Sequence, residues 1–276
     1  MPLRAKAEIL RKLHQGPRVL LLPNVWDVAS ARLIEEAGFP ALATSSAAIA
    51  NSLGYPDGEH IGRTNMLEVV GRIAEAVSVP VTADLEAGYA GTPQEMKDTA
   101  GELLESGAVG LNLEDSWEEK SLVAAEEHAA KVRAVREAGD AAGVHIVINA
   151  RTDVYLAQIG PPESRFDETL RRGRAYRQAG ADCIFVPGLR DAATIGRLVK
   201  DLACAVNILA GPGVPPIAEL EKLGVARVSL GSSPHRATLG LLRRLAQEVR
   251  EQGTYSALEG MVSYAEANAL FRPRGK

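Results

Sequence analysis

Short apolar segments alternate with longer segments of mixed polarity along most of the chain. The apolar segments are rich in Val, Ile, Leu and Ala, as are strands buried on both faces, and they lie at residues 18–24, 41–46, 79–84, 109–115, 145–153, 182–187, 205–210 and 227–231. The longer segments predict helices at residues 27–37, 64–77, 93–106, 122–138, 166–179, 192–201, 217–223 and 234–252. The pattern is therefore one of eight consecutive strand–helix units.

Strict alternation of apolar strands with helices is typical of parallel strands that helices cover. Eight such units in 276 residues predict an α/β fold of the (β/α)8, or TIM-barrel, kind. A doubly wound open sheet is the alternative, but it usually carries a glycine-rich phosphate turn after its first strand. The segment Pro23–Asp27 is not such a turn.

Two helical segments lie outside the eight units. Residues 1–15 form a charged amphipathic pattern, which predicts an N-terminal helix ahead of the barrel. The last residues carry a helical apolar pattern that exceeds what the barrel needs, made of Leu258, Met261, Val262, Ala265 and Leu270. We therefore expect a barrel domain over residues 1–252 and a helical tail over residues 253–276, which packs on a partner subunit or on the outside of the barrel.

Composition excludes several classes of protein. Lys and Arg total 31 against 35 Asp and Glu, and no basic stripe is visible, which argues against a nucleic-acid surface. No segment approaches the roughly 20 apolar residues that a membrane helix needs, and the N-terminus has no apolar signal core. We therefore expect a soluble, cytoplasmic protein in which Cys183 and Cys204 are reduced thiols rather than a disulfide.

Two carboxylates, Asp84 and Glu86, end the third predicted strand with one residue between them. Residues two apart on an extended backbone point the same way, so both acids are expected to face one spot. Two like charges at such a short distance repel each other unless a cation lies between them, and Mg2+ is the natural candidate. A solvated acidic turn explains this stretch alone equally well.

In a barrel, the carboxyl ends of the strands form the active site. The polar residues expected there are Thr44, Ser45, Ser46, Asp84, Glu86, Glu114, Asp115, Arg151, Asp153, Ser232 and Ser233. Converging acids suggest a hydrated metal ion, and an arginine beside them suggests a bound carboxylate or phosphate. No lysine lies on a predicted strand and no histidine ends one, which disfavours Schiff-base and histidine–zinc chemistry. A metal-assisted reaction through an oxyanion, such as an enolate, remains.

Four motifs, in chain order, resemble the isocitrate lyase/phosphoenolpyruvate mutase superfamily, whose members bind Mg2+ and make a pyruvate-like enolate. The motifs are P-N-V-W-D with S-A-R-L at residues 23–27 and 30–33, T-S-S-A with L-G-Y-P-D at 44–47 and 53–57, D-L-E-A-G-Y at 84–89, and E-D with A-R-T-D at 114–115 and 150–153. The resemblance covers nearly the whole chain and implies a TIM barrel whose members associate and often exchange a C-terminal helix.

The resemblance also implies roles for individual residues. Asp84 would hold Mg2+ (or Mn2+) directly, and Glu86 and Glu114 would reach the ion directly or through water. Ser45 and the backbone N–H groups of Ser46 and Ala47 would bind the keto-acid end of the substrate. Arg151 would bind a carboxylate, although an internal ion pair with Asp153 or Glu114 is the alternative, and Asp57 would assist catalysis, although a simple turn residue is the alternative.

The segment after Glu114–Asp115 departs from the family pattern. Lyases of the superfamily carry a Lys-x-Cys-Gly-His loop there, and its cysteine donates a proton, whereas residues 116–122 contain neither cysteine nor histidine. The mutases and phosphonopyruvate hydrolases carry a lysine followed by Asn-Ser; Lys120 lies at the corresponding place, but without the Asn. The acidic residues Glu118 and Glu119 would repel a second anionic group.

We therefore expect a Mg2+-dependent enzyme that cleaves a carbon–carbon bond of a small 2-keto or 2-hydroxy di- or tricarboxylate, of the isocitrate, methylisocitrate or oxaloacetate type. One alternative is P–C bond chemistry on phosphonopyruvate with Lys120 on the phosphonate, and another is a barrel that binds a keto acid with little turnover. A phosphosugar enzyme that uses glycines 211, 213 and 231 is a weaker possibility. We expect a homodimer or homotetramer joined through the C-terminal helix.

Overall fold

A computed structural model describes residues 1–117 and 121–272 of the chain. Nine strands form one parallel sheet in the order β1-β11-β10-β9-β8-β5-β4-β3-β2. Their bounds are β1 Leu20–Leu22, β2 Asn24–Val25, β3 Leu42–Thr44, β4 Val81–Asp84, β5 Gly110–Glu114, β8 Val147–Arg151, β9 Cys183–Phe185, β10 Ala205–Leu209 and β11 Arg227–Ser229. The two ends of this order, β1 and β2, are consecutive pieces of chain on either side of Pro23, so the sheet closes into a barrel of eight staves. The predicted TIM barrel is confirmed.

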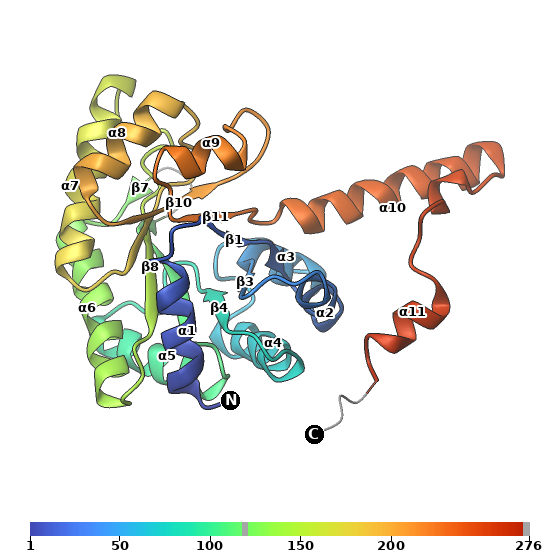
Figure 1. Cartoon of the computed structure of the whole chain (residues 1–276), viewed down its shortest axis with the longest axis horizontal. Helices are drawn as coiled ribbons and strands as arrows, with labels where there is room; N and C mark the ends of the chain where they lie inside the picture. The colour runs from blue at the N-terminus through green and yellow to red at the C-terminus, as the bar shows by residue number, and fades with distance from the viewer. Residues whose placement is uncertain (118–120, 273–276) are drawn as a thin grey trace.

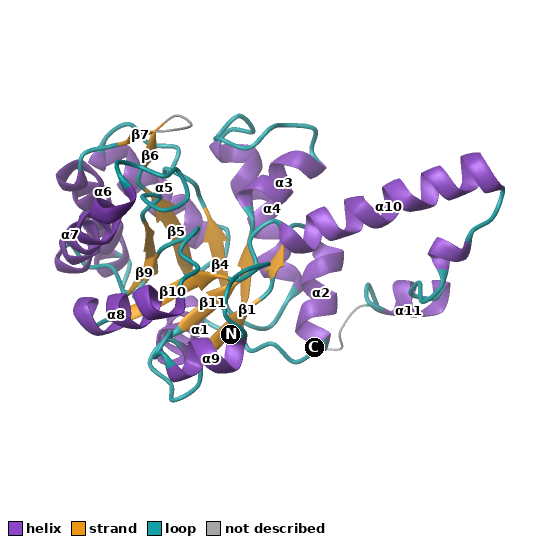
Figure 2. Cartoon of the chain, turned by 90° about the horizontal axis from the view of Figure 1, so that it is seen from above, coloured by secondary structure: helices purple, strands orange, loops and turns teal. Residues whose placement is uncertain are grey.

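Helices surround the strands, as Figures 1 and 2 show. Their bounds are α1 Leu3–Leu13, α2 Val28–Glu36, α3 Ser46–Ser52, α4 Arg63–Ala76, α5 Pro93–Glu105, α6 Ala125–Ala141, α7 Arg165–Gln178, α8 Ala192–Leu202, α9 Ile217–Lys222, α10 Ser233–Gln252 and α11 Tyr264–Ala269. Short 3-10 turns lie at Pro162–Ser164 and Ser256–Leu258. The predicted N-terminal and C-terminal helices are present as α1 and α11.

Two local predictions need correction. The second predicted strand reaches residue 46, but Ser45 caps a short helix, α3, which the apolar pattern does not reveal. The helix predicted to begin at residue 122 begins at Ala125 instead, because β6 (Ser116–Trp117) and β7 (Ser121–Leu122) form a small antiparallel hairpin. Both differences lie at the carboxyl ends of strands, where loops rather than the barrel set the conformation.

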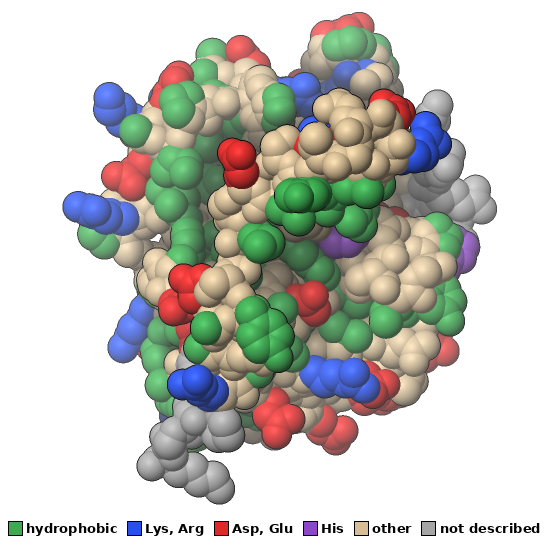
Figure 3. All heavy atoms as spheres, turned by 90° about the vertical axis from the view of Figure 1, so that its right-hand side faces the viewer, with side chains coloured by type: hydrophobic (Ala, Val, Ile, Leu, Met, Phe, Trp, Pro, Cys, Tyr) green, Lys and Arg blue, Asp and Glu red, His purple; other side chains and the backbone are tan. Residues whose placement is uncertain are grey.

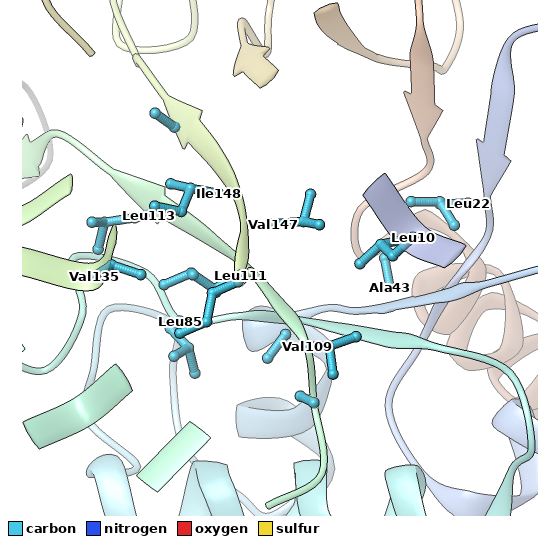
Figure 4. Close-up of a cluster of buried hydrophobic side chains, with 14 of the residues drawn as sticks. Leu10, Leu22, Ala43, Leu85, Val109, Leu111, Leu113, Val135, Val147 and Ile148 are labelled. Carbon is cyan, nitrogen blue, oxygen red and sulfur yellow. The ribbon is translucent and has the colours of Figure 1, made fainter. Parts of the chain in front are cut away.

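Helix α1 closes the amino-terminal end of the barrel. Leu10 is fully buried there, in the same cluster of buried side chains as Val109 and Val147 (Figure 4). Gly110 makes this packing possible, because a Cβ at that position would lie 2.9 Å from Leu10 Cδ2 and 2.9 Å from the Val147 carbonyl oxygen. The core is thus sealed at one end, and the opposite end of the barrel is left for the loops.

Helix α10 projects away from the barrel, and the tail turns back along it toward α11 (Figures 1 and 2). None of the helices in the described ranges combines the length and the apolarity that crossing a bilayer requires. Cys183 and Cys204 are both free thiols, as predicted.

Two buried histidines predict how stability responds to acid. Burial lowers the pKa of His14 to about 4 and that of His128 to about 3. A histidine of the unfolded chain takes up its proton near pH 6.5. The contribution of His14 and His128 to the free energy of unfolding is therefore fully present above that pH and is lost as the pH falls toward 4. Each pH unit in this window costs up to about 1.4 kcal/mol per histidine. Urea unfolding should therefore give a much lower free energy of unfolding at pH 5 than at pH 7, and a His128→Phe variant should reduce this difference. An equal difference in the variant would contradict the role given to His128.

Candidate active site

Asp84 ends β4 and is buried at the carboxyl end of the barrel. Its Oδ2 accepts hydrogen bonds from the backbone N–H (3.0 Å) and the hydroxyl (2.8 Å) of Ser46, and its Oδ1 accepts one from the side-chain amide of Asn112 (3.1 Å). A carboxylate offers about four acceptor positions, so these three bonds leave about one. One free position is what direct binding of a metal ion would need.

A buried polar chain supports Asp84 from inside the barrel. The Oδ1 of Asn112 accepts hydrogen bonds from Asn149 Nδ2 (2.7 Å) and Arg227 Nη2 (3.2 Å), so the amide nitrogen of Asn112 is the group that faces Asp84. Burial lowers the pKa of the fully enclosed Arg227 to about 10, and Cys183 and Asp84 oppose this shift. The side-chain amide of Asn112 thus bridges the Asp84 carboxylate and the buried guanidinium of Arg227.

Glu86 lies beyond the end of β4, in a turn. Its φ of 52° is left-handed, so the prediction that Asp84 and Glu86 point the same way along one strand is wrong. Its Oε2 accepts hydrogen bonds from the N–H groups of Gly58 (2.8 Å) and Glu59 (2.7 Å), and its Oε1 accepts one from the Tyr89 hydroxyl (2.8 Å). Burial raises the pKa of Glu86 to about 7; the bond from Tyr89 lowers it, and neighbouring carboxylates raise it further. Glu86 therefore ties the loop after α3 to the end of β4.

The backbone around Glu86 is unusual for residues with a side chain. Glu59, Glu86 and Tyr89 have φ values of 64°, 52° and 51°. Gly88 lies between two of them, and a Cβ there would come within 2.5 Å of Met96 Sδ. Non-glycine residues in this region cost on the order of 1–3 kcal/mol each and cluster at functional sites. The conformation of this turn is a second, independent sign of a functional site.

Arg151 ends β8 and lies between two carboxylates. Its Nη1 is 2.5 Å from Glu114 Oε2, and its Nε and Nη2 donate to the two oxygens of Asp153 at 2.6 and 2.8 Å. Ser116 of the β6–β7 hairpin also hydrogen-bonds Asp153. Burial raises the pKa of Glu114 well above its usual range, and Arg151 counteracts that rise. The internal ion pairs foreseen as the alternative for Arg151 are both present.

The serine-rich segment that was predicted to bind a keto acid forms the start of α3. The Ser45 hydroxyl accepts a bond from the Ala48 N–H (3.4 Å), and the Ser46 N–H is directed to Asp84. Ala47 lies in the first turn of the helix, where N–H groups have no helical acceptor. Of the predicted group, the Ala47 N–H is therefore the donor best placed for a bound oxyanion.

Asp115 does not join the acids at the mouth. It is fully buried and bonds Arg172 (3.0 Å) and the Tyr176 hydroxyl (2.6 Å) on α7. Of the pair Glu114–Asp115, only Glu114 faces the site.

A cavity of about 680 Å³ opens at this end of the barrel. Its walls carry five acidic residues, Asp57, Glu59, Glu86, Glu114 and Asp153, and they also include His60, Ser116 and Ser121. No lysine or arginine is among the described wall residues. Lys120, predicted to be catalytic, lies outside the described residues. The described part of the cavity is therefore strongly acidic, with Arg151 behind Glu114 and Asp153.

In the described ranges, no three His, Cys, Asp or Glu side chains are arranged to hold one ion by direct contact. Asp84, Glu86 and Glu114 are thus not a closed set of direct ligands. The donor set still fits a hard cation, because burial and mutual repulsion raise the pKa values of Glu86 and Glu114 and a cation would relieve both effects. Mg2+ usually keeps several waters, which fits Asp84 as a direct ligand and the two glutamates as partners of bound water.

Several site residues were missed in the sequence. Asn112, Asn149 and Arg227 lie within apolar strands, and that position was the available signal, because a polar residue in a buried strand needs a partner. Tyr89 closes the D-L-E-A-G-Y motif but was given no role there, and Glu59 lies in a loop where no pattern in the sequence pointed to it.

The barrel and its acidic mouth define an enzyme that works at the carboxyl ends of a (β/α)8 fold. The sequence profile of the family described as phosphoenolpyruvate phosphomutase matches residues 10–250. The chain belongs to this family, within the isocitrate lyase/phosphoenolpyruvate mutase superfamily of lyases and mutases.

Three relatives illustrate the match. An uncharacterised protein of Mycobacterium tuberculosis is 36% identical over 93% of each chain. Oxaloacetate decarboxylase 2 of Pseudomonas putida is 30% identical over 87% of this chain and 78% of its own. A crystal structure described as a lyase/mutase from Burkholderia cenocepacia has a TM-score of 0.91 at 35% identity and covers 98% of this chain and 97% of its own.

Proposed function

We propose that this chain is a divalent-metal-dependent lyase that cleaves a carbon–carbon bond of a small 2-keto or 2-hydroxy di- or tricarboxylate through an enolate. Oxaloacetate is the first substrate to test. The observation that carries the proposal is Asp84, which keeps about one acceptor position free beside the start of α3. It lies two residues before Glu86, which lines the acidic cavity. The similarity to an oxaloacetate decarboxylase along most of the chain supports the same class of substrate.

Mg2+ or Mn2+, when bound, would supply positive charge to the keto oxygen and to the enolate oxygen that develops from it. Asp84 would hold the ion directly, and Glu86 and Glu114 would hold its waters. The Ala47 N–H, at the positive end of α3, would bind the same end of the substrate. Arg151 would bind a substrate carboxylate in place of part of its bonding to Glu114 and Asp153.

The acidic cavity favours loss of CO2 over binding of a phosphonate. In a decarboxylation the carbon–carbon bond to the carboxylate breaks and CO2 leaves as a neutral molecule. The electron pair of that bond stays with the neighbouring carbon to form the enolate, which then takes up a proton. A carboxylate among Glu86, Glu114 and Asp153 is repelled before the bond breaks, and the repulsion ends once CO2 forms. Asp57 would transfer the proton that the enolate takes up, since desolvation and the nearby Asp84 raise the pKa of its carboxyl group.

The two alternative functions give different results in the same assays. A phosphonate dianion needs cations, and the described cavity walls offer no lysine or arginine, so P–C chemistry depends on Lys120. A barrel that binds a keto acid with little turnover needs only the binding residues. Residues 116–122 lack the cysteine that donates a proton in lyases of the superfamily, which is the reason to consider this alternative.

Oxaloacetate, isocitrate, methylisocitrate, malate-type acids and phosphonopyruvate should be assayed with Mg2+ and with EDTA. We expect pyruvate and CO2 from oxaloacetate, and no turnover in EDTA. Release of phosphate or phosphoenolpyruvate that disappears in Lys120→Ala would replace the proposal by P–C chemistry. Mg2+-dependent binding of a keto acid in calorimetry, without turnover of any compound, would replace it by a binding function.

We also propose that two copies of the chain, or four, associate through the C-terminal tail, as expected from the sequence, together with α10 before it. The exposed side chains of α10 include Leu239, Leu241, Leu242 and Val249, and Figure 3 shows hydrophobic groups gathered on this side of the molecule. An apolar cavity of about 630 Å³ lies beside β1 and α1, lined by Ile9, Leu13, Val19, Leu21, Phe39 and Pro40 among others. Its walls come from α1, from β1 and the turn before it, and from Phe39 and Pro40 ahead of β3, and this apolar surface would be covered in the proposed assembly.

A substitution on α10 tests this assembly. We expect the wild-type protein to sediment as a dimer or tetramer, and the Leu241→Asp/Leu242→Asp variant to dissociate, because the charged groups would have to be buried without partners. Arg244→Ala, on the same helix, should leave the mass unchanged. A monomeric wild-type protein in analytical ultracentrifugation would rule the assembly out.

A further inference from the structure

We propose that Asp115, Arg172 and Tyr176, here called the Asp115 clamp, position Arg151 for binding of the substrate carboxylate. None of the three touches the cavity, so they would act as positioning residues. The inference rests on the proposed function in one respect only, the role of Arg151 toward a carboxylate.

The clamp lies between β5 and α7. The Oδ2 of Asp115 accepts hydrogen bonds from Arg172 Nη1 (3.0 Å) and from the Tyr176 hydroxyl (2.6 Å). Arg172 is in turn held by Glu168, whose Oε1 accepts from Arg172 Nε at 2.7 Å. The side chains of Asp115 and Arg172 are 0% and 8% exposed, so water does not compete for these bonds.

The same carboxylate fixes the chain that follows Arg151. The Oδ1 of Asp115 accepts a hydrogen bond from the Asp153 N–H (3.0 Å), and the Asp115 N–H donates to the Arg151 carbonyl (3.2 Å). Asp153 then holds the Arg151 guanidinium by two bonds. Asp115 thus sets the backbone on both sides of Thr152, and with it the place of the carboxylate that orients Arg151.

The clamp also fixes the end of the β6–β7 hairpin. The Val123 N–H donates to the Asp115 carbonyl (3.0 Å), and Arg172 Nη1 donates to the Val123 carbonyl (2.9 Å). Ser116, at the start of the hairpin, hydrogen-bonds Asp153. One buried group therefore holds the three segments that converge on Arg151, and small errors in the position of such a residue lower activity strongly.

The Tyr176→Phe variant tests the clamp with little risk to the fold. It removes one bond to Asp115 and keeps the ring, which packs edge-on against His128 with ring centres 4.5 Å apart. Tyr264→Phe, which removes the hydroxyl of a tyrosine that is 88% exposed on α11, is the matched control. In protein labelled with 15N-arginine, the Nε–H signal of Arg151 is assigned by its loss in Arg151→Lys.

We expect Tyr176→Phe to speed exchange of the Arg151 Nε–H with water about tenfold and to raise KM about tenfold, with kcat changed less than about twofold. Tyr264→Phe should change neither value. An unchanged Arg151 signal in Tyr176→Phe overturns the clamp, whatever the reaction is. A changed signal with unchanged KM in an active enzyme also overturns the proposal, because the clamp is then only structural. If the wild-type protein turns over no keto acid, the signal still decides whether the clamp positions Arg151, and the proposed function alone fails.

Discussion

The Asp84→Asn variant is expected to lose about 10³-fold in turnover of its substrate, because it loses the charge that would hold the metal ion. The amide would keep the size of the side chain, but its NH2 group cannot accept from Ser46 or Asn112. Mn2+ binding followed by electron paramagnetic resonance should weaken in parallel with the loss of turnover. Asp98→Asn, on an exposed position of α5, is the control.

The same variant is expected to be less stable, since Arg227 loses the carboxylate that it faces through Asn112. A buried charge that loses its partner is destabilised, and the effect is smaller than for a direct ion pair because Asn112 lies between the two groups. Adding Arg227→Met should restore stability without restoring turnover. If Asp84→Asn keeps full Mn2+ affinity and full turnover, Asp84 is not the residue that binds the metal.

The Arg151→Met variant is expected to lose both substrate binding and stability. Without the guanidinium, kcat/KM should fall by about 10²-fold or more, because a paired carboxylate contact is lost. Glu114 and Asp153 would remain buried without their cation, which costs on the order of 3–5 kcal/mol. Steady-state kinetics and urea unfolding measure the two effects separately.

The loss of stability in Arg151→Met should grow as the pH rises from 5 to 8. Burial raises the pKa of Glu114, and Arg151 is the group that limits this rise. A carboxyl group whose folded pKa is raised contributes stability at low pH and loses it as the pH rises through that value. Arg133→Met, an exposed arginine on α6, should show no such trend. A loss of stability that is equal at both pH values would contradict the buried pair.

Most secondary structure was predictable because barrel strands are apolar runs and the helices between them are long. The helix predicted over residues 27–37, for example, is α2, which runs from Val28 to Glu36 with Asp27 as its cap. What the pattern could not show was α3 and the β6–β7 hairpin, because each is too short for a periodic signal. Both lie at the active-site end, where loops differ most from a regular pattern.

The acidic residues of the site were predictable from their position at strand ends, but their directions were not. Asp84 faces the mouth, whereas the left-handed turn at Glu86 and the inward turn of Asp115 toward α7 depend on partners distant in the sequence. Arg227 and Asn112 are 115 residues apart, and no local spacing relates them.

The sequence by itself determined the barrel, its order of elements and the residue types that gather at one end, because each follows from local composition and from the rule that parallel strands share a carboxyl edge. Only the tertiary structure decided which carboxylates stay at the mouth and which are neutralised inside. That choice depends on burial and on contacts such as Asp115 with Arg172 and Arg151 with Glu114, since the energy of a charge is set by the groups around it rather than by its neighbours along the chain.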